Sequence, residues 1–406
     1  MNRQFRFLLM LAVALNFVPG FSVQTVHAQA EQTLYSFTGF ADGGNPLSSL
    51  VVDSAGNLYG TTFVGGAHGA GEVFELTPNA GGGWTETVLY SFTGGADGAN
   101  PYLADVVFDK AGNLYGTTVG GGAHNLGAVF ELSPTSSGWS ETVLYSFSGG
   151  SDGANPYAGL LFDGAGNLYG TTNGGGANNV GTVFELRHGS GASWTEKVLH
   201  TLNTTDGSGP IGGLVFDRAG NLYGTTQGGG TAGAGVVYEV VRGASGTWTQ
   251  KVLHSFTGGA DGGFPYAERL IFDRGGNLYG TTSGGGTLSL GAVFRLRPVS
   301  GGWKEKVLYS FDGQVAANPY SGLVLDSQGN LYGTAANGNG VTTVGAVFQL
   351  TRQSGDTWTE TNLHLFTRGD GEFPESALLR DQAGNLYGTT LQGGTGNMGV
   401  VFELSQ

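Results

Sequence analysis

The sequence predicts an all-β fold, a seven-bladed β-propeller with four antiparallel strands in each blade. The first basis is a phrase of Asp, two variable residues and Gly-Asn-Leu-Tyr-Gly-Thr, which begins at Asp53, Asp109, Asp163, Asp217, Asp273, Asp326 and Asp381. Successive copies lie 53 to 56 residues apart, a period typical of propellers and solenoids. The second basis is that β-branched and aromatic residues alternate with polar ones between clusters of Gly, Pro and Ser, without any helical period. The third is that the two ends of the chain hold complementary parts of one repeat.

The repeat covering residues 101–147 illustrates the expected blade. Its apolar and alternating segments predict four strands, over residues 106–108, 114–118, 128–132 and 139–147. The phrase from Asp109 to Asn113 predicts a tight hairpin turn, in which the Asp carboxylate accepts backbone N–H groups and the Gly adopts a positive φ. A solenoid would have longer, flatter strands and distinct capping repeats, which the sequence lacks. Four short strands in each of seven repeats therefore predict a propeller.

The ends of the chain predict how the ring closes. The last repeat stops after its third strand, at residues 401–404, and residues 31–37 match the fourth strand of every other repeat. The N-terminal strand is therefore expected to complete the C-terminal blade, so that one domain of residues 31–406 has no exposed sheet edge. Six tryptophans open six of the fourth strands, and the seventh copy of this position falls at Gln29.

Residues 1–30 have the character of a secretory signal peptide. Arg3 and Arg6 precede an apolar run, and small residues surround a cleavage point after Ala30. The protein is therefore expected to be secreted, to the periplasm or beyond the cell. Removal of the leader would change the formal net charge from −14 to −16, which argues against nucleic acid and anionic membranes as partners. The sequence contains no Cys, which excludes disulfides and thiolate chemistry.

The repeated segments resemble the Gloeo-Verruco tandem repeat, a family of secreted bacterial proteins. The resemblance covers residues 31–406, through Gly-Asn-Leu-Tyr-Gly-Thr-Thr, the Gly-Gly-Gly loop and Val-Phe-Glu-Leu. It implies an exported repeat protein, and it brings no catalytic residues with it. Members often carry a C-terminal sorting anchor, whereas this chain ends at Gln406 without one, so release rather than tethering is expected. More distantly, the Asp-x-x-Gly-Asn-Leu-Tyr phrase is similar to the blades of streptogramin lyases and gluconolactonase-type propellers.

Loops that join consecutive blades are the first candidate binding elements. Six of these loops carry an aspartate in an Asp-Gly pair, namely Asp42, Asp97, Asp152, Asp206, Asp261 and Asp370, and the sixth loop along the chain lacks one. One interpretation is a duplicated turn, because Asp-Gly is a common turn sequence. The other is a ring of ligand-binding loops. Calcium sites are less favoured, because Ca²⁺ needs about 6–8 oxygen ligands.

Histidines and symmetry-breaking residues supply the other candidates. His68 and His124 occupy equivalent loops of adjacent blades, where they are either duplicated loop residues or a general base and its partner. The innermost strand is normally preceded by small residues, but Asp105 breaks this rule in the second blade and Glu268 and Arg269 break it in the fifth. Both blades carry one extra residue there, which suggests a bulge. These charges either plug the central channel as an ion pair or contact a ligand at its mouth.

These observations favour a secreted binding or interaction module rather than an enzyme. The expected partner is a polysaccharide or a protein at the loop face, bound at several similar loops by a monomer that uses no cofactor and no metal. A propeller lyase or lactone hydrolase is the alternative, and it would require one asymmetric cluster of His and carboxylates. A purely structural envelope role is the third possibility. Fold alone does not choose among these.

Overall fold

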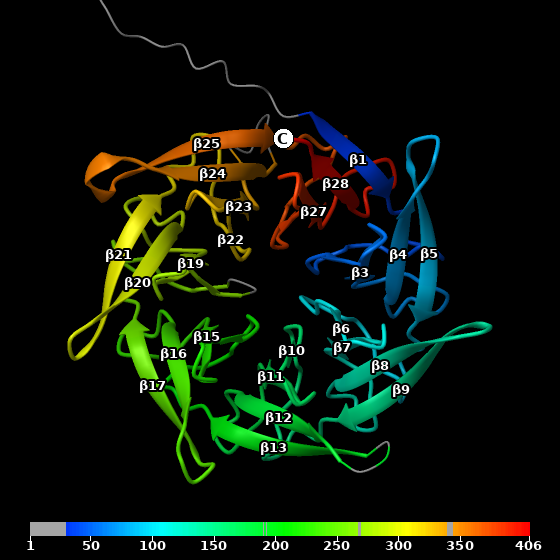
Figure 1. The fold of residues 1–406 in the computed structure, drawn as a ribbon, viewed down its shortest axis with the longest axis horizontal. Coiled ribbons are helices and arrows are strands. Elements are labelled where there is room, and N and C mark those ends of the chain that lie inside the picture. The colour runs from blue at the N-terminus through cyan, green and yellow to red at the C-terminus, as the bar shows by residue number, and fades with distance from the viewer. Residues whose placement is uncertain (1–29, 190, 192, 267–268, 339–343) are drawn as a thin grey trace, which may run out of the picture.

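A computed structural model describes residues 30–189, 191, 193–266, 269–338 and 344–406 of the chain. It confirms an all-β, seven-bladed propeller, in which seven sheets of four antiparallel strands surround a central axis (Figure 1). Among the described residues the only helical element is one 3₁₀ turn, Ser354–Asp356. In the same part of the chain, no helix has the length and apolarity that a bilayer span requires.

Every blade has the same four strand positions, counted outward from the axis. The innermost strands are two residues long: β2 (Val51–Val52), β6 (Val107–Phe108), β10 (Leu161–Phe162), β14 (Val215–Phe216), β18 (Ile271–Phe272), β22 (Val324–Leu325) and β26 (Leu379–Arg380). The second strands are β3 (Leu58–Thr62), β7 (Leu114–Thr118), β11 (Leu168–Thr172), β15 (Leu222–Thr226), β19 (Leu278–Thr282), β23 (Leu331–Ala335) and β27 (Leu386–Thr390). The third strands are β4 (Glu72–Pro78), β8 (Ala128–Thr135), β12 (Thr182–His188), β16 (Val236–Arg242), β20 (Ala292–Val299), β24 (Ala346–Arg352) and β28 (Val400–Leu404). The fourth are β5 (Trp84–Ser91), β9 (Gly138–Ser146), β13 (Trp194–Thr201), β17 (Trp248–Ser255), β21 (Gly302–Ser310), β25 (Trp358–Leu365) and β1 (Glu31–Ser36).

The N-terminal strand closes the ring as the sequence predicted. β1 pairs antiparallel with β28, from Glu31 opposite Leu404 to Ser36 opposite Val400. The seventh sheet therefore has the order β1-β28-β27-β26, and Figure 1 shows β1 alongside β28. Because this pairing supplies the fourth strand of the last blade, all seven blades are complete.

The repeated phrase folds as a turn followed by a buried strand. In the second blade the Asp109 carboxylate accepts hydrogen bonds from the backbone N–H of Ala111 at 2.8 Å and of Asn113 at 2.9 Å, as expected for this turn. The following strand β7 is buried along its whole length. Gly116 lies opposite Phe130 of β8, and a Cβ on this glycine would lie 2.6 Å from the Phe130 ring. The glycine of the phrase therefore makes room for the core aromatic of the next strand.

Blades pack on one another through a repeated pair of aromatic rings. A fully buried Phe that follows a fourth strand meets a buried Phe in the third strand of the next blade, at centroid separations of 5.0–5.2 Å in six of the seven junctions. Phe92 against Phe130 is one such edge-to-face pair. At the remaining junction the corresponding residues are Leu202 and Tyr238, both of which are buried. The core is thus a ring of interblade contacts.

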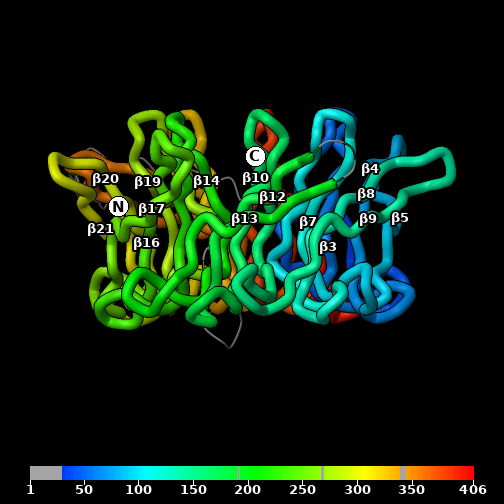
Figure 2. Tube along the Cα trace, turned by 90° about the horizontal axis from the view of Figure 1, so that it is seen from below, coloured from blue at the N-terminus to red at the C-terminus, as the bar shows by residue number. Residues whose placement is uncertain are grey.

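The propeller has two chemically different faces. The loop face holds the blade-joining segments and the loops between second and third strands, which meet through bridges such as Ala99 with Gly120 and Ala154 with Gly174. The hairpin face holds the Asp-x-x-Gly-Asn turns and the turns between third and fourth strands. Figure 2 shows the ring from the side, with hairpins along one face and broader loops along the other.

Candidate functional site at the loop face

The residue that follows the proline of each blade-joining segment lies near the axis. These residues are Leu47, Tyr102, Tyr157, Ile211, Tyr266, Tyr320 and Glu375. Five of them, Leu47, Tyr102, Tyr157, Ile211 and Tyr266, belong to one apolar cluster although they come from five different blades. A cluster of that composition can form only where the blades converge. Four tyrosines and one glutamate therefore surround the axis at the loop face.

The tyrosines are in contact with one another across the axis. The Tyr102 and Tyr266 hydroxyls are 2.9 Å apart, which joins the second blade to the fifth. Tyr157 packs against Tyr102 with ring centroids 5.1 Å apart, and Tyr320 packs against Tyr266 at 5.0 Å in an edge-to-face geometry. Burial is the largest of the causes that raise the pKa of the Tyr102, Tyr266 and Tyr320 hydroxyls, so these groups stay neutral. They can therefore donate hydrogen bonds to a ligand.

Phe264 adds an exposed aromatic ring in a strained backbone conformation. It has a φ of 56° and its side chain is 44% exposed. The equivalent residues of four other loops are asparagines with φ of 54–55°, a residue type that tolerates this region: Asn45, Asn100, Asn155 and Asn318. A phenylalanine here costs about 1–3 kcal/mol of backbone strain, and residues held in such conformations cluster at functional sites. Phe373 shows the same exchange in the last of these loops, with a φ of 57°.

These side chains line a cavity of about 540 Å³ at the loop face. Its walls include Tyr102, Tyr266, Tyr320, Phe264 and Glu375. We call these five residues, together with Tyr157, the aromatic mouth. Burial raises the pKa of Glu375 to about 7, so both its neutral and its ionised forms are accessible near neutral pH. The volume lies within the usual range of about 300–1,000 Å³ for ligand pockets.

An ion pair crosses the central channel beneath the aromatic mouth. The Asp105 carboxylate lies 3.8 Å from the Arg269 guanidinium and accepts the backbone N–H of Ser49 at 2.8 Å. Burial raises the pKa of Asp105 and the nearby guanidinium opposes that shift. Both residues line a cavity of about 220 Å³ between the innermost strands of several blades. The structure therefore brings together two of the three predicted channel residues, and Glu268 lies outside the described residues.

The extra residue of the second blade does not produce a bulge in its innermost strand. β6 pairs with β7 without a register shift, from Val107 opposite Tyr115 to Phe108 opposite Leu114. The additional residue is taken up ahead of the strand, where the Asp105 N–H donates to the Leu103 carbonyl at 3.2 Å. Register shifts occur instead between third and fourth strands, as between Val129 and Phe130.

The six loop aspartates hold their own turns. Asp97 is representative, because it accepts the Thr93 backbone N–H at 2.8 Å and the Tyr90 hydroxyl at 3.0 Å. The same aspartate position receives a Tyr hydroxyl in three loops and faces a His Nε2 in the other three, at 3.0–3.2 Å: Tyr35, Tyr90, Tyr145, His200, His254 and His364. These contacts agree with the turn interpretation, and a ligand role for the aspartates stays a prediction. Through them Asp42, Asp97, Asp152, Asp206, Asp261 and Asp370 fix the loops around the mouth.

His68 and His124 are exposed residues in loops between second and third strands. Neither is among the residues that line the aromatic mouth, and among the described residues they do not form a cluster with carboxylates. Their predicted role as a general base and its partner therefore gains no geometric support. They stay exposed polar candidates on the loop face.

The aromatic mouth is not among the sites predicted from the sequence, although the sequence contains a signal for it. The residue after the proline varies as Leu, Tyr, Tyr, Ile, Tyr, Tyr and Glu around the ring, so this position departs from exact repetition and is rich in aromatic residues. Nothing in the spacing shows that Tyr102 and Tyr266, 164 residues apart, share a hydrogen bond.

A second cavity lies at the hairpin face between the fourth and fifth blades. It measures about 440 Å³, and its walls include Tyr223, Phe272, Trp303, Arg218 and Arg274. The Trp303 and Tyr223 ring centroids are 6.0 Å apart. This cavity is an aromatic slot between two neighbouring blades. Equivalent Trp–Tyr contacts occur at other junctions, for example Trp194 with Tyr115, so the slot is a feature of the repeat.

Comparison with known proteins places the chain among repeat proteins of the same fold. The model of the Gloeobacter/Verrucomicrobia repeat matches residues 20–184, 82–268 and 244–406. No curated protein sequence matches the chain. Among solved structures, PorZ, a surface component of the type-IX secretion system of Porphyromonas gingivalis, is 16% identical with a TM-score of 0.51, over 90% of this chain and 46% of PorZ.

Two further structures share the architecture. An extracellular domain from B. thetaiotaomicron is 12% identical with a TM-score of 0.57, over 92% of this chain and 40% of that one. A polysaccharide lyase of family PL25, an ulvan lyase, is 10% identical with a TM-score of 0.52, over 91% of this chain and 95% of the lyase. The chain spans less than half the length of PorZ and of the extracellular domain. At these identities the likeness concerns the fold alone.

Proposed function

We propose that this chain, which belongs to the Gloeobacter/Verrucomicrobia repeat family, is a secreted, non-enzymatic binding propeller whose aromatic mouth holds a neutral polysaccharide chain. The observation that carries the proposal is the cavity of about 540 Å³ walled by Tyr102, Tyr266, Tyr320, Phe264 and Glu375. Secretion is proposed from the leader-like character of residues 1–30.

The mouth combines the two kinds of contact that a sugar ring needs. The faces of pyranose rings are apolar and pack on aromatic side chains, which combine a large apolar body with a polar tip. Tyr266 and Phe264 come from one loop and supply such surfaces, and Phe264 is 44% exposed. The tyrosine hydroxyls and the Glu375 carboxyl offer hydrogen bonds to sugar hydroxyls, which fix the orientation of the ring.

Charge favours an uncharged glycan over an acidic one. The formal net charge of the chain is −14, and the charged residue in the mouth wall is Glu375. The only cation described in the channel below, Arg269, is already paired with Asp105. An acidic polysaccharide would therefore approach against the field of the protein.

A single site at the axis changes the number of ligands that we expect each chain to bind. The loop aspartates were predicted to give several equivalent sites, but their carboxylates are engaged by the turns they belong to. The mouth is formed once per molecule, because it takes side chains from several blades. One site per chain is therefore the valency that we propose.

The test is a binding titration with neutral oligosaccharides, such as cello-, xylo- and malto-oligosaccharides, and with an acidic polysaccharide for comparison. Phe264→Asn installs the residue that four other loops carry at the same φ, so it should fold normally and weaken binding by about tenfold or more, which corresponds to ~1.4 kcal/mol. Phe373→Asn makes the same exchange at a residue that does not line the cavity, so this substitution should leave binding unchanged. Equal effects of the two substitutions, or more than one site per chain, would contradict the proposal.

One observation favours an enzymatic alternative. Glu375 has a pKa of about 7 and lies in a cavity with neutral tyrosine hydroxyls, which is a combination suited to general acid–base chemistry on a glycosidic linkage. Incubation of each bound oligosaccharide with the protein, followed by chromatography, separates the two functions. Cleavage that disappears in Glu375→Gln would establish the enzyme, whereas intact oligosaccharide after prolonged incubation supports the binding module.

A further inference from the structure

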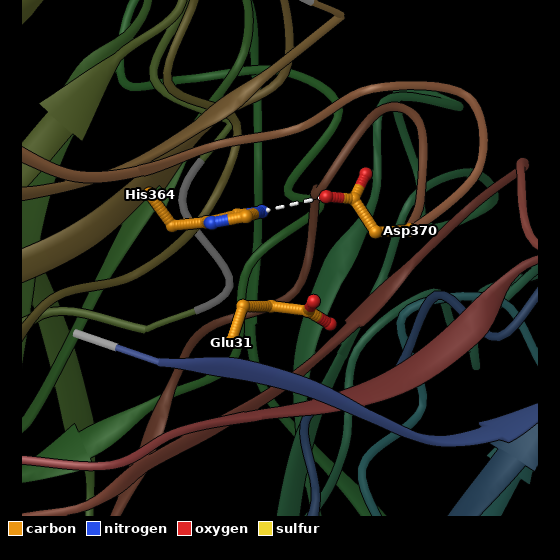
Figure 3. Close-up of side chains that lie close together, drawn as sticks. All are labelled: Glu31, His364 and Asp370. Atoms are coloured by element: carbon orange, nitrogen blue, oxygen red, sulfur yellow. Dashed lines mark hydrogen bonds and ion pairs between the residues drawn. The ribbon is translucent and has the colours of Figure 1, made fainter. Parts of the chain in front are cut away.

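The junction between the sixth and seventh blades contains three side chains of metal-binding type. Glu31 is the first residue of β1, His364 lies near the end of β25, and Asp370 follows in the loop that joins the two blades. Figure 3 shows the three side chains facing one another, with the His364 Nε2 3.1 Å from Asp370 Oδ2. One ligand atom from each lies within 4.8 Å of the other two, and no other such trio occurs among the described residues.

The repeat explains how this trio arises. Near the end of the fourth strand, four blades carry a tyrosine and three carry a histidine at the equivalent position: His200, His254 and His364. Two residues after the position of the tryptophan, the fourth strands carry a glutamate or, once, Gln250: Glu31, Glu86, Glu141, Glu196, Glu305 and Glu360. The junction between the sixth and seventh blades combines a histidine, an aspartate and a glutamate, and its glutamate comes from the closing strand β1. The junction between the fourth and fifth blades has the same three residue types, His254, Asp261 and Glu305, but among the described residues they do not bring one ligand atom each within 4.8 Å of one another.

We propose that Glu31, His364 and Asp370 bind one divalent transition-metal ion, for which Zn²⁺ is the probe, and that this ion fastens the closing strand to the sixth blade. Imidazole and carboxylate are ligands that Zn²⁺ accepts, with bonds of about 2.0–2.2 Å. Tetrahedral bonds of that length separate neighbouring ligand atoms by roughly 3.3–3.6 Å. The His364–Asp370 spacing of 3.1 Å is already close to this value.

The surroundings hold the ligands in place. Asp370 Oδ1 accepts the Thr367 backbone N–H at 2.7 Å and its hydroxyl at 3.0 Å, which leaves Oδ2 directed at His364. The Glu31 carboxylate accepts the Thr33 hydroxyl at 3.1 Å. Hydrogen bonds of this kind orient ligating carboxylates in known metal sites. The side chains of His364 and Asp370 are 16% and 24% exposed, so a water molecule can complete the coordination.

Ligand chemistry selects the class of ion. A nitrogen ligand with two carboxylates suits Zn²⁺ and its first-row neighbours, whereas Ca²⁺ requires about 6–8 oxygens, more than this trio provides. Such an ion would bind the closed ring and not an open chain, because Glu31 meets the other two ligands only when β1 is in place. Binding would therefore stabilise closure. This site is separate from the aromatic mouth, so the two proposals stand or fall independently.

The test uses full-length mature protein stripped with a chelator and titrated with Zn²⁺ by calorimetry. His364→Tyr installs the residue that four other blades carry, and Glu31→Gln keeps the shape of the carboxylate. His200→Tyr is the matched control, because its His–Asp pair at 3.1 Å is followed by Gln250, whose amide donates to the Asp206 carbonyl at 3.0 Å.

We expect one Zn²⁺ per chain in the wild type and in His200→Tyr, and at least tenfold weaker binding in His364→Tyr and in Glu31→Gln. Zn²⁺ should raise the melting temperature of the first two proteins and leave that of His364→Tyr unchanged, while the metal-free melting temperatures show that every variant folds. Failure to observe stoichiometric Zn²⁺ binding would overturn the proposal. So would undiminished binding by His364→Tyr, which would place the ion at exposed residues such as His68, or an equal loss in His200→Tyr.

Discussion

Ring closure by β1 can be tested at a single side chain, Phe37. Its ring is fully buried, and it lies 5.2 Å from Phe74 of the first blade and 5.0 Å from Tyr35. Its backbone N–H donates to the Gly399 carbonyl at 3.0 Å. Phe37 therefore joins the N-terminal segment both to its own blade and to the next. Replacement of a buried Phe by Ala costs about 3–5 kcal/mol, because apolar contacts are lost and a cavity remains.

Two matched substitutions serve as references for the free-energy cost of Phe37→Ala. Phe92 holds the equivalent place at an interior junction, where it is fully buried, lies 5.1 Å from Phe130 and donates its N–H to Gly71. Phe92→Ala should therefore cost the same as Phe37→Ala if the closing junction is as well packed as the others. Phe40 lies three residues beyond Phe37 and is 79% exposed, so Phe40→Ala should change stability by less than about 0.5 kcal/mol.

Urea denaturation followed by tryptophan fluorescence measures all three variants, since the chain has six tryptophans. The midpoint shift multiplied by the slope gives each change in the free energy of unfolding. A loss of about 3–5 kcal/mol is a large part of the ~5–15 kcal/mol that stabilises a typical domain. The closed ring would be refuted if Phe37→Ala behaved like Phe40→Ala while Phe92→Ala showed the full loss.

Three further predictions concern burial and titration. Tyr238→Phe should stabilise the protein by about 1–3 kcal/mol, because the buried Tyr238 hydroxyl has no partner among the described residues, and thermal melting that shows a loss would reveal a hidden one. Burial raises the pKa of five fourth-strand glutamates to about 7, Glu86, Glu141, Glu196, Glu305 and Glu360. Because their pKa in the unfolded chain is about 4.3, the folded state binds more protons between these values, and the melting temperature should fall as pH rises from about 4.5 to about 7. Glu86→Gln should flatten that slope, and a melting temperature that rises over the same range would contradict it. Glu72, fully buried with a pKa raised to about 9, should extend the decline above pH 7, and Glu72→Gln should remove that extension.

The fold was predictable because each repeat contains the residues that form its own turns and strands. The Asp109 turn, the glycine that admits Phe130, and the alternation of the outer strands are local features that recur seven times. The match of residues 31–37 to the other fourth strands then determined the closure. The aromatic mouth follows different rules. Tyr102 meets Tyr266 only because the ring brings the second and fifth blades to one axis, and a local pattern contains no information on that distance.

The candidate residues were predictable to differing degrees for the same reason. Asp105 and Arg269 were found as departures from a repeated pattern, and the structure pairs them across the channel. The loop aspartates were visible as a pattern, but only the structure shows that Asp97 is occupied by Thr93 and Tyr90. The Glu31 trio could not be found from spacing, because its ligands come from the two ends of the chain.

The closure of the ring by β1 imposes an order of events on synthesis. Of the described strands, β1 is made first and its native partner β28 last, because the other blades lie between them in the chain. Meanwhile β4 is available, and the segment Leu34–Phe37 carries the same kind of residues as Leu89–Phe92, the native neighbour of β4. β1 can therefore occupy the outer edge of the first blade until β5 displaces it. Such non-native pairing between near-identical repeats is a kinetic trap, and non-local closure is intrinsically slow. The similarity between blades thus adds a kinetic competition between native and non-native partners of β1 to the thermodynamic stability of the closed ring.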